Sequence, residues 1–182
     1  MSSVAVHPSP IQGLGLFATR DSRAGGIILR RDEFREVTPD APLRPDLGEE
    51  RRHCDDLDGG RTVLLGYPER HLNHSCDSNA YVRFIHGVGH ICARRDIAQG
   101  EEITNDYCIN SFGDGVWTCA CHSARCRKLI HVNFFEGPLG LQIECLLLLA
   151  EWFVAEHPAE MARLMRAAVP YLGANADSGT KS

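Results

Sequence analysis

The sequence of 182 residues contains only two lysines, Lys128 and Lys181, and no long apolar run. The remaining basic residues are arginines, largely single or in isolated pairs, and the formal net charge is −5. Chains that bind phosphate backbones usually carry a basic patch, so neither direct nucleic-acid binding nor a basic nuclear-targeting tract is predicted. The most apolar stretch, 145–150, is far shorter than the roughly 20 residues that cross a bilayer, so no membrane association is predicted.

A secretory signal is also absent from the sequence. The first residues, MSSVAVHPSP, lack both a charged region and an apolar region. We therefore expect a reducing compartment and a cytoplasmic protein. The alternatives are a nuclear or chromatin-associated protein, or one delivered to a host. With 43% hydrophobic and 24% charged residues, the composition is that of a globular domain that forms its core without disulfides.

Strand and turn signals dominate the first 110 residues. Short apolar runs punctuated by glycine at 13–17 and 25–29 favour strands over a helix. Two strands at 81–85 and 90–93 are predicted around a glycine-bearing hairpin loop, followed by another strand at 101–104. The remaining predictions are a variable insertion at 32–70, with weak strand content at 62–65, and a glycine- and cysteine-rich loop at 111–127.

The character of the chain changes after Gly137. Dense apolar residues predict a helix over 139–156, which His157-Pro158 ends, and a second helix over 159–169. We expect these helices to form a hairpin that either packs on the body or joins two chains as a homodimer. The small, polar residues 173–182 predict a disordered tail.

Eight cysteines stand out in a chain of this kind, and three of them cluster. Cys119, Cys121 and Cys126 lie within eight residues, a spacing that can occupy three corners of a zinc tetrahedron. Cys76 is the favoured fourth ligand, since a remote ligand would fasten the loop to the core. Free or disulfide-forming thiols are the alternative. The other four cysteines are interpreted as small apolar residues rather than ligands: Cys54, Cys92, Cys108 and Cys145.

Four blocks, in this order along the chain, resemble SET-domain protein lysine methyltransferases with a post-SET zinc loop. They are Gly13-Leu-Gly-Leu-Phe17, Leu72-Asn-His-Ser-Cys-Asp-Ser-Asn79, Gly100-Glu-Glu-Ile-Thr-Asn-Asp-Tyr107, and the Cys-x-Cys-x4-Cys run followed by Arg127. The resemblance covers about 4–131. The second and third blocks at this spacing, followed by the cysteine run, are highly specific, whereas a single Gly-x-Gly is weak.

The resemblance implies a mainly β fold with a pseudoknot, in which the 103–107 segment threads near the 72–76 segment. It divides the chain into a SET domain (4–110), a post-SET zinc loop (111–131), a C-terminal helical extension (138–170) and the predicted tail. The family also uses a cysteine at the position of Cys76 together with the three post-SET cysteines. One structural Zn2+ ion on these four thiolates is therefore implied.

The activity that the resemblance implies is transfer of a methyl group from S-adenosylmethionine to a lysine amine of a protein substrate. Histones or histone-like chromosomal proteins are the substrate class that the family suggests. The amine must be neutral to attack, although free lysine titrates near ~10.4. An apolar channel and the positive charge of the cofactor both disfavour the ammonium form. The alternative is a catalytically inactive SET-like module that only binds a partner protein.

The matching blocks also carry over site residues. Tyr107 would be the catalytic residue, with its hydroxyl where amine, methyl and sulfonium meet; a buried core tyrosine is the alternative. The remaining cofactor contacts implied by the resemblance are Gly13, Leu14, Gly15, Asn73, His74 and Leu129. Hydrogen bonding within the loops, or a simple β-turn at the glycines, are the alternatives for these residues.

One position departs from the family pattern. The family often has an aromatic residue where Asn105 stands, and that position helps to shape the lysine channel in many members. The departure leaves open how many methyl groups are added. Tyr81, Phe84 and Phe112 are candidate channel aromatics, with core packing as the equal alternative for each. Trp117 would either help to cover the cofactor or anchor its loop.

Overall fold

Strand β1 (Val4–Pro8) pairs antiparallel with β2 (Leu14–Ala18) at the start of a computed structural model that describes residues 2–178. Side chains are described through Tyr171, and Met1 and 179–182 lie outside the described residues. By its internal contacts the chain divides into two units. The first unit runs to Tyr107 and includes Thr118–Leu129, and the second comprises Cys108–Trp117 and the chain from Ile130 onward.

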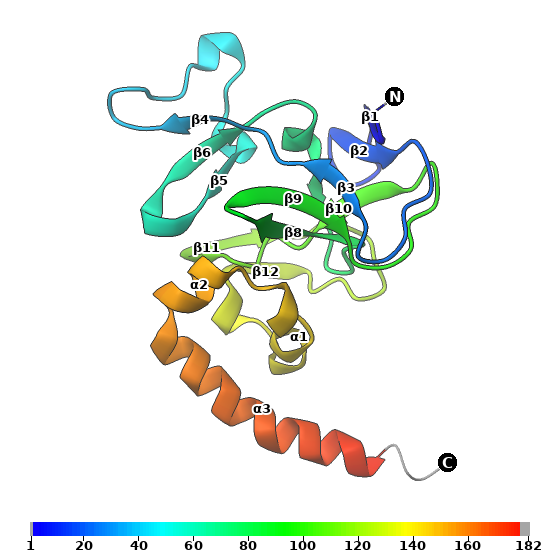
Figure 1. The fold of residues 1–182 in the computed structure, drawn as a ribbon, viewed down its shortest axis with the longest axis vertical. Helices are drawn as coiled ribbons and strands as arrows, with labels where there is room; N and C mark the ends of the chain where they lie inside the picture. Colours follow the sequence, from blue (N-terminus) through cyan, green and yellow to red (C-terminus); the bar gives the residue numbers. More distant parts are fainter. Residues whose placement is uncertain (1, 179–182) are drawn as a thin grey trace. The chain divides into compact units, whose positions relative to one another are not determined.

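The first sheet of this unit carries the segments that resemble the family blocks. Its order is β1-β2-β10-β7, with β10 at Glu102–Asn105 and β7 at Asn73–His74. Figure 1 labels the first three of these strands. Strand β10 is antiparallel to β2 and parallel to β7. The expected approach of the 103–107 segment to the 72–76 segment is thus confirmed as a parallel pairing.

A second sheet has the order β3-β9-β8, with β3 at Ile27–Arg30, β9 at Val88–Ala93 and β8 at Ala80–Ile85. The predicted hairpin is present, but its loop is only His86-Gly87, not four residues. Both residues have positive φ, 51° and 77°. Two successive left-handed residues match the right-handed twist of the flanking strands, and the turn can therefore be this short.

The insertion at 32–70 is more ordered than the sequence predicts. A third sheet has the order β4-β6-β5, with β4 at Glu33–Val37, β6 at Thr62–Leu65 and β5 at Cys54–Asp56. Short 3₁₀ turns connect and flank these strands: Pro45–Leu47 (η1), Arg51–His53 (η2), Asp58–Gly60 (η3) and Glu69–His71 (η4). The last of these turns leads directly into β7.

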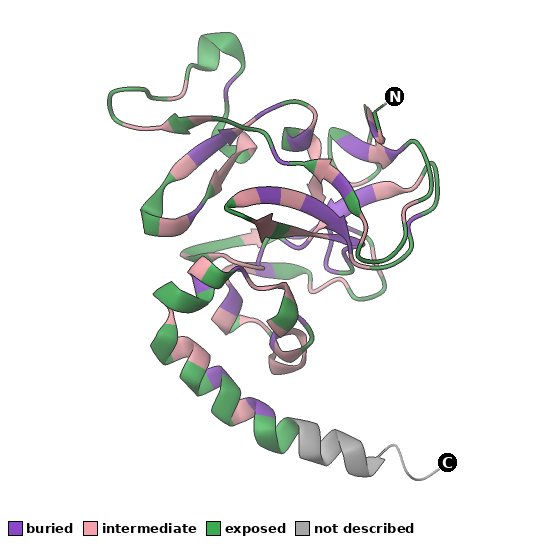
Figure 2. Cartoon of the chain, viewed as in Figure 1, coloured by how far each residue is buried: buried purple, intermediate pink, exposed green. Residues whose placement is uncertain are grey.

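The core of the first unit is built from the inward faces of its first two sheets. Figure 2 shows buried positions along β2 and β9. The buried cluster comprises Val4, Leu16, Ala18, Ile28, Ala80, Ile91, Ala93, Ile97 and Ile103. At about 25 cal/mol per Å² of apolar surface removed from water, this burial is the main stabilising contribution to the unit.

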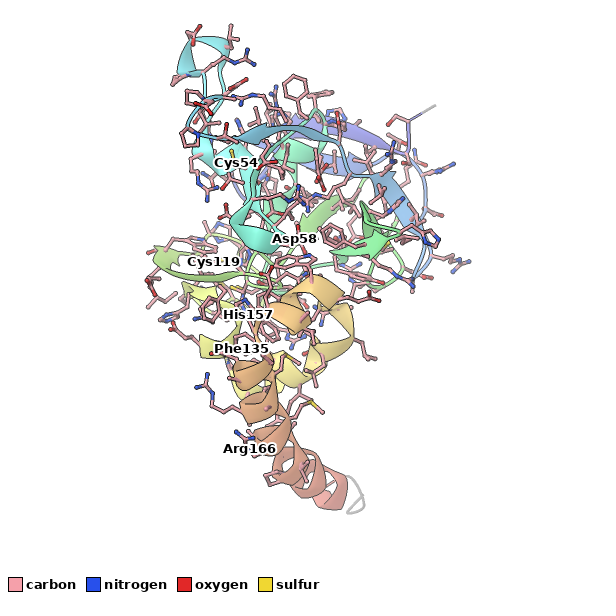
Figure 3. All side chains as sticks on the ribbon, turned by 60° about the vertical axis from the view of Figure 1, so that its left-hand side comes forward. Cys54, Asp58, Cys119, Phe135, His157 and Arg166 are labelled. Carbon is pink, nitrogen blue, oxygen red and sulfur yellow. The ribbon has the colours of Figure 1, made fainter. Side chains whose placement is uncertain are left out.

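Apart from Thr118 and Leu129, the two-stranded sheet of β11 (Phe112–Thr118) and β12 (Leu129–Asn133) belongs to the second unit. The prediction of a loop over 111–127 is therefore wrong for the part that forms β11. The turn η5 (Phe134–Glu136) and helices α1 (Leu139–Glu144), α2 (Glu151–Glu156) and α3 (Pro158–Ser178) follow. Within this unit Phe135 and Phe153 stack 5.5 Å apart, and His157 lies close to them (Figure 3).

The predicted helix over 139–156 is interrupted. After α1 and the 3₁₀ turn Leu146–Leu148 (η6), Leu149 and Ala150 are extended. The N–H of Ala150 donates to the side-chain oxygen of Asn110 at 2.7 Å, so it makes no helical bond there. The helical part thus has α1, α2 and α3 among its described residues, rather than a two-helix hairpin.

Helix α3 extends through Ser178 and so passes Gly173, where the sequence predicts a disordered tail. Alanines after Gly173 favour the helical backbone. The last part of that predicted tail, 179–182, lies outside the described residues. No helix that the structure describes combines the length and apolar character needed to span a membrane.

Candidate active site and cysteine cluster

The parallel pairing of β7 with β10 brings together residues that are more than 30 positions apart in the sequence. Asn105 lies opposite His74 in the ladder, and the N–H of Ser75 donates to the carbonyl of Asn105 at 2.9 Å. The N–H of Tyr107 donates to His74 Nδ1 at 3.1 Å. The structure therefore brings Tyr107 into contact with His74, next to Asn73, whereas the roles of these residues in binding and catalysis stay predictions.

Tyr107 is fixed at both ends. Its hydroxyl donates to the carbonyl of Leu72 at 2.6 Å, and its ring meets that of His74 edge-on with centroids 5.3 Å apart. Burial, followed by the negative charges of Asp55 and Glu102, raises the pKa of Tyr107 to about 12. The residue is nevertheless 44% exposed. The phenol is consequently neutral near pH 7 and open to a ligand, which suits an orienting group rather than a base.

Asn73 anchors the glycine-containing segment through its side-chain amide. Nδ2 donates to the carbonyls of Gln12 at 3.2 Å and Leu14 at 3.0 Å, and to Glu102 Oε1 at 2.9 Å. The loop-stabilising role left open for Asn73 is therefore present. These bonds hold the start of β2 against the site.

Glu102 is a residue that the sequence did not single out. Its carboxylate accepts hydrogen bonds from the Ser9 hydroxyl at 2.8 and 3.0 Å as well as the bond from Asn73. A Cβ atom at Gly15 would lie 2.2 Å from Glu102 Oε1, so a side chain there would displace the Glu102 carboxylate. Gly13 adopts φ +52° with open space around its Cβ position, and Leu14 is 46% exposed. The backbone here can approach a ligand closely.

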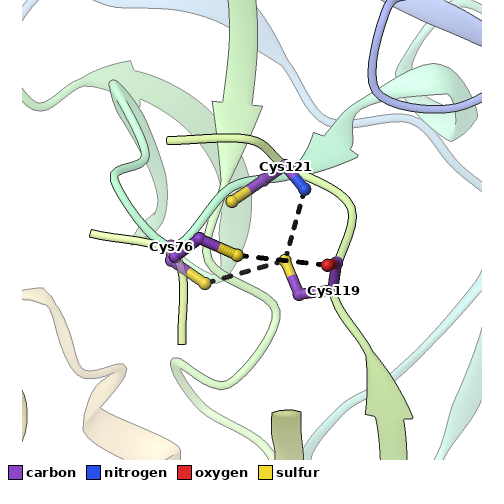
Figure 4. A group of neighbouring side chains, drawn as sticks. Cys76, Cys119 and Cys121 are labelled. Atoms are coloured by element: carbon purple, nitrogen blue, oxygen red, sulfur yellow. Dashed lines mark hydrogen bonds between the residues drawn. The ribbon is translucent and has the colours of Figure 1, made fainter. Parts of the chain in front are cut away.

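The four cysteines of the predicted metal site converge. The sulfurs of Cys76, Cys119, Cys121 and Cys126 all lie within 4.8 Å of one another, and those of Cys76 and Cys119 are 3.7 Å apart (Figure 4). Sulfurs about 2.3 Å from a central zinc ion lie ~3.8 Å apart at the corners of a tetrahedron. The cluster therefore has a ligand set and spacing that could hold one metal ion.

Hydrogen-bond donors surround the sulfur of Cys76. Because His74 Nδ1 accepts the N–H of Tyr107, the ring carries its hydrogen on Nε2, which lies 3.4 Å from Cys76 Sγ. Arg127 donates to the same sulfur from its backbone N–H at 3.3 Å and from Nε at 3.4 Å. Burial raises the pKa of the Cys76 thiol, and the donors from Arg127 oppose that shift by stabilising the thiolate, the form that ligates metals.

Arg127 also connects the cysteine loop to the site. Its Nη2 donates to Asp106 Oδ1 at 2.7 Å, and the side chain of Asp106 is only 1% exposed. Asp106 directly precedes Tyr107. The segment 118–129 is therefore held next to Tyr107 by an ion pair as well as by the cysteines.

The other residues singled out from the sequence have mixed surroundings. Leu129 is 53% exposed at the end of the first unit, whereas Trp117 belongs to the second unit. Phe112 stacks on His157 at 4.2 Å within the second unit but is 51% exposed, so it is not a core residue. Tyr81 and Phe84 are half-buried on β8. The four cysteines outside the cluster are buried at three positions and half-buried at one: Cys92, Cys108, Cys145 and Cys54.

Comparison with known proteins identifies the family. Residues 13–108 match the SET domain family, and the chain belongs to that family. The family resemblance seen in the sequence is therefore confirmed.

Curated relatives carry histone-directed names. Histone-lysine N-methyltransferase trithorax of Drosophila virilis is 34% identical over 138 residues, covering 70% of this chain and 4% of that protein. Human histone-lysine N-methyltransferase 2B is 33% identical over 140 residues, covering 71% of this chain and 5% of that protein. This chain thus spans about one twentieth of the length of these relatives.

Among solved structures, a Plasmodium falciparum protein described as a candidate histone methyltransferase is 21% identical, with a TM-score of 0.45. The match covers 59% of this chain and 94% of that one.

Proposed function

We propose that this chain is a protein-lysine N-methyltransferase that uses S-adenosylmethionine. The observation that carries the proposal is the meeting of β7 and β10, which sets Tyr107 beside Asn73 and His74 inside a segment that matches the SET domain family. The relatives that share about 70% of this chain are named as histone-lysine methyltransferases. Histones or similar basic proteins are therefore the proposed substrates, and an acidic chain would attract them.

The cofactor site of this proposal is the surface around the start of β2 and β7. The backbone of Gly13, Leu14 and Gly15, together with Asn73 and His74, would hold the cofactor. Two half-exposed apolar side chains of the first unit, Leu14 and Leu129, offer surface for it to cover. When bound, S-adenosylmethionine supplies the methyl group on a sulfonium that a lysine amine displaces.

Tyr107 would orient the amine and the methyl group. Its hydroxyl proton is directed at the Leu72 carbonyl, so the phenol oxygen faces a ligand as an acceptor. That oxygen can take weak C–H···O contacts from a polarised methyl group. Because its pKa is about 12, Tyr107 does not take the proton that the lysine ammonium loses, and we assign that proton to water. Alignment and exclusion of bulk water then provide most of the catalysis.

We further propose that the cysteine cluster holds one structural zinc ion. The spacing of the sulfurs and the donors at Cys76 support that identity. The histone-directed names of the relatives favour chromatin, the alternative localisation, over the cytoplasm.

The test is incubation of the protein with labelled S-adenosylmethionine and a panel of basic proteins that includes purified core histones. Transfer of label to lysine by the wild-type chain, reduced at least about 100-fold in kcat by Tyr107→Phe, is the expected result. Tyr67→Phe alters a 64% exposed tyrosine and serves as the control. Cofactor binding without transfer to any protein of the panel would instead favour the inactive binding module.

A further inference from the structure

A buried ion cluster lies in the first unit, outside the residues assigned above. Arg31 donates from Nε to Glu69 Oε1 and from Nη2 to Asp55 Oδ2, both at 2.7 Å. The side chains of Arg31 and Glu69 are 1% and 3% exposed. The second oxygen of Glu69 accepts the N–H of Asp32 at 2.9 Å. Desolvating such a cluster is costly, and an apolar core would give similar stability; its presence therefore points to a role beyond stability.

The cluster is connected to Tyr107 through a short turn. Glu69 begins η4, and its carbonyl accepts the N–H of Leu72 at 2.8 Å. The carbonyl of Leu72 in turn accepts the Tyr107 hydroxyl. The charge of Asp55 also contributes to the raised pKa of Tyr107. The cluster therefore adjoins the turn whose C-cap residue, Leu72, accepts the Tyr107 hydroxyl.

Asp55 is the member of the cluster that solvent can reach. Its side chain is 47% exposed, in contrast to those of Arg31 and Glu69. Arg31 holds Oδ2, and Oδ1 accepts the N–H of Asp56 at 3.0 Å. A carboxylate offers about four lone-pair positions, so these two bonds leave room for further donors. Asp55 is therefore a fixed carboxylate with capacity for a cation.

Asn105 offers a second acceptor, at the β7–β10 pairing. It lies opposite His74 in the β7–β10 ladder, two residues before Tyr107. Its buried Oδ1 receives no hydrogen bond from any residue that the structure describes. A buried amide oxygen without a donor is costly, and an incoming N–H group would satisfy it.

We propose that Asp55, held by Arg31 and Glu69, is a substrate-binding residue that accepts the cationic side chain of the protein substrate at Tyr107. The inference rests on the proposed function and concerns how that site recognises its substrate. The lysine enters as an ammonium ion, with Asn105 Oδ1 as a further acceptor. The ammonium then loses a proton to water, the amine nitrogen forms the bond to carbon, and the sulfide leaves with the electron pair of the broken S–C bond.

The test compares Asp55→Asn with Asp56→Asn. Asp56 is the next residue of β5, points to the other face of the strand and makes an exposed pair with Arg51. Both variants remove one negative charge from the same strand. Asparagine at position 55 can still accept from Arg31, which favours retention of the fold. Circular dichroism selects a temperature at which both variants are folded.

With core histones as the substrate, Asp55→Asn is expected to raise KM for the protein at least about tenfold, because a hydrogen bond to a charged group is lost. We expect kcat and KM for S-adenosylmethionine to stay within about threefold of wild type. Asp56→Asn is expected to behave as wild type. Equal KM values for Asp55→Asn and wild type, or equal effects of the two variants, would overturn this inference and leave the proposed function standing. A wild-type chain that is inactive on the whole panel would overturn the proposed function itself.

Discussion

His74 Nε2 lies 3.4 Å from the sulfur of Cys76, while Nδ1 of the same ring accepts the N–H of Tyr107 at 3.1 Å. One imidazole therefore joins the cysteine cluster to the residue proposed to orient the substrate. Burial of the His74 ring lowers the pKa of His74 to about 4, whereas the negative charge of Asp106 opposes this shift. The ring is accordingly neutral near pH 7, so Nδ1 can accept from Tyr107 while Nε2 donates to Cys76.

Replacing His74 with alanine should weaken both parts of the site. Loss of the N–H donor to Cys76 is expected to reduce zinc affinity by about 10- to 100-fold, the usual effect of removing a partner of a metal ligand. Competition with a chromophoric zinc chelator measures the affinity. His90→Ala is the control, because His90 Nδ1 bonds only the carbonyl of Val88 among the contacts described. Unchanged zinc affinity in His74→Ala would argue against the link.

The cysteine cluster itself can be tested through metal content. Cys119→Ser should reduce bound zinc from about one ion per chain to near zero and loosen the segment 118–129, because metal binding and folding are coupled. Atomic absorption gives the metal content, and resistance to limited proteolysis gives the order of the segment. Cys54→Ser, a half-buried cysteine outside the cluster, is the control. Equal zinc content in the two variants would exclude the cluster as the site.

The contact between Gly15 and Glu102 allows a test of the cofactor-binding segment. Alanine at position 15 would displace the Glu102 carboxylate, since its Cβ would lie 2.2 Å from Oε1. We expect a loss of about 1–3 kcal/mol of unfolding free energy, together with weaker binding of S-adenosylmethionine by calorimetry. Gly113→Ala, where the nearest atom is 3.4 Å away, provides the matched control. Wild-type cofactor affinity in Gly15→Ala would contradict the placement.

Much of this site follows from local sequence, since the relevant residues lie in short blocks. Asn73, His74 and Cys76 share one block, Tyr107 ends another, and the spacing of three cysteines already suggests a tetrahedral site. The sequence predicts the hairpin of β8 and β9 because two short runs rich in apolar residues flank a glycine-bearing loop.

The ion cluster could not be found in this way. Asp55 and Glu69 lie 24 and 38 positions after Arg31 in the sequence. The region between them shows no clear hydrophobic period. Only the tertiary fold pairs them. The break after α1 has a similar origin, because Asn110, a residue far from it in sequence, accepts the N–H of Ala150. The helix propensity of residues 139–156 gives no indication of this tertiary hydrogen bond.

Glu69 should make stability depend on pH. Burial raises the pKa of Glu69 from 4.5 to about 7, while Arg31 opposes the shift. A folded-state pKa above the unfolded value means that the native state binds the proton more tightly. The stabilising contribution is then fully present below about pH 4.5 and is lost as the pH rises through about 7.

The corresponding variant is Glu69→Gln, whose amide cannot ionise. Urea unfolding measures the free energy of unfolding at pH 5 and at pH 8. Between these two pH values it should fall by about 2 kcal/mol more in wild type than in Glu69→Gln. Glu50→Gln removes a carboxylate from an exposed pair with Arg52 and should keep the wild-type dependence. If Glu69→Gln and wild type lose the same free energy between the two pH values, Glu69 is ionised throughout. In that case Arg31 outweighs burial, and the cluster carries a net negative charge near Tyr107 even at pH 5.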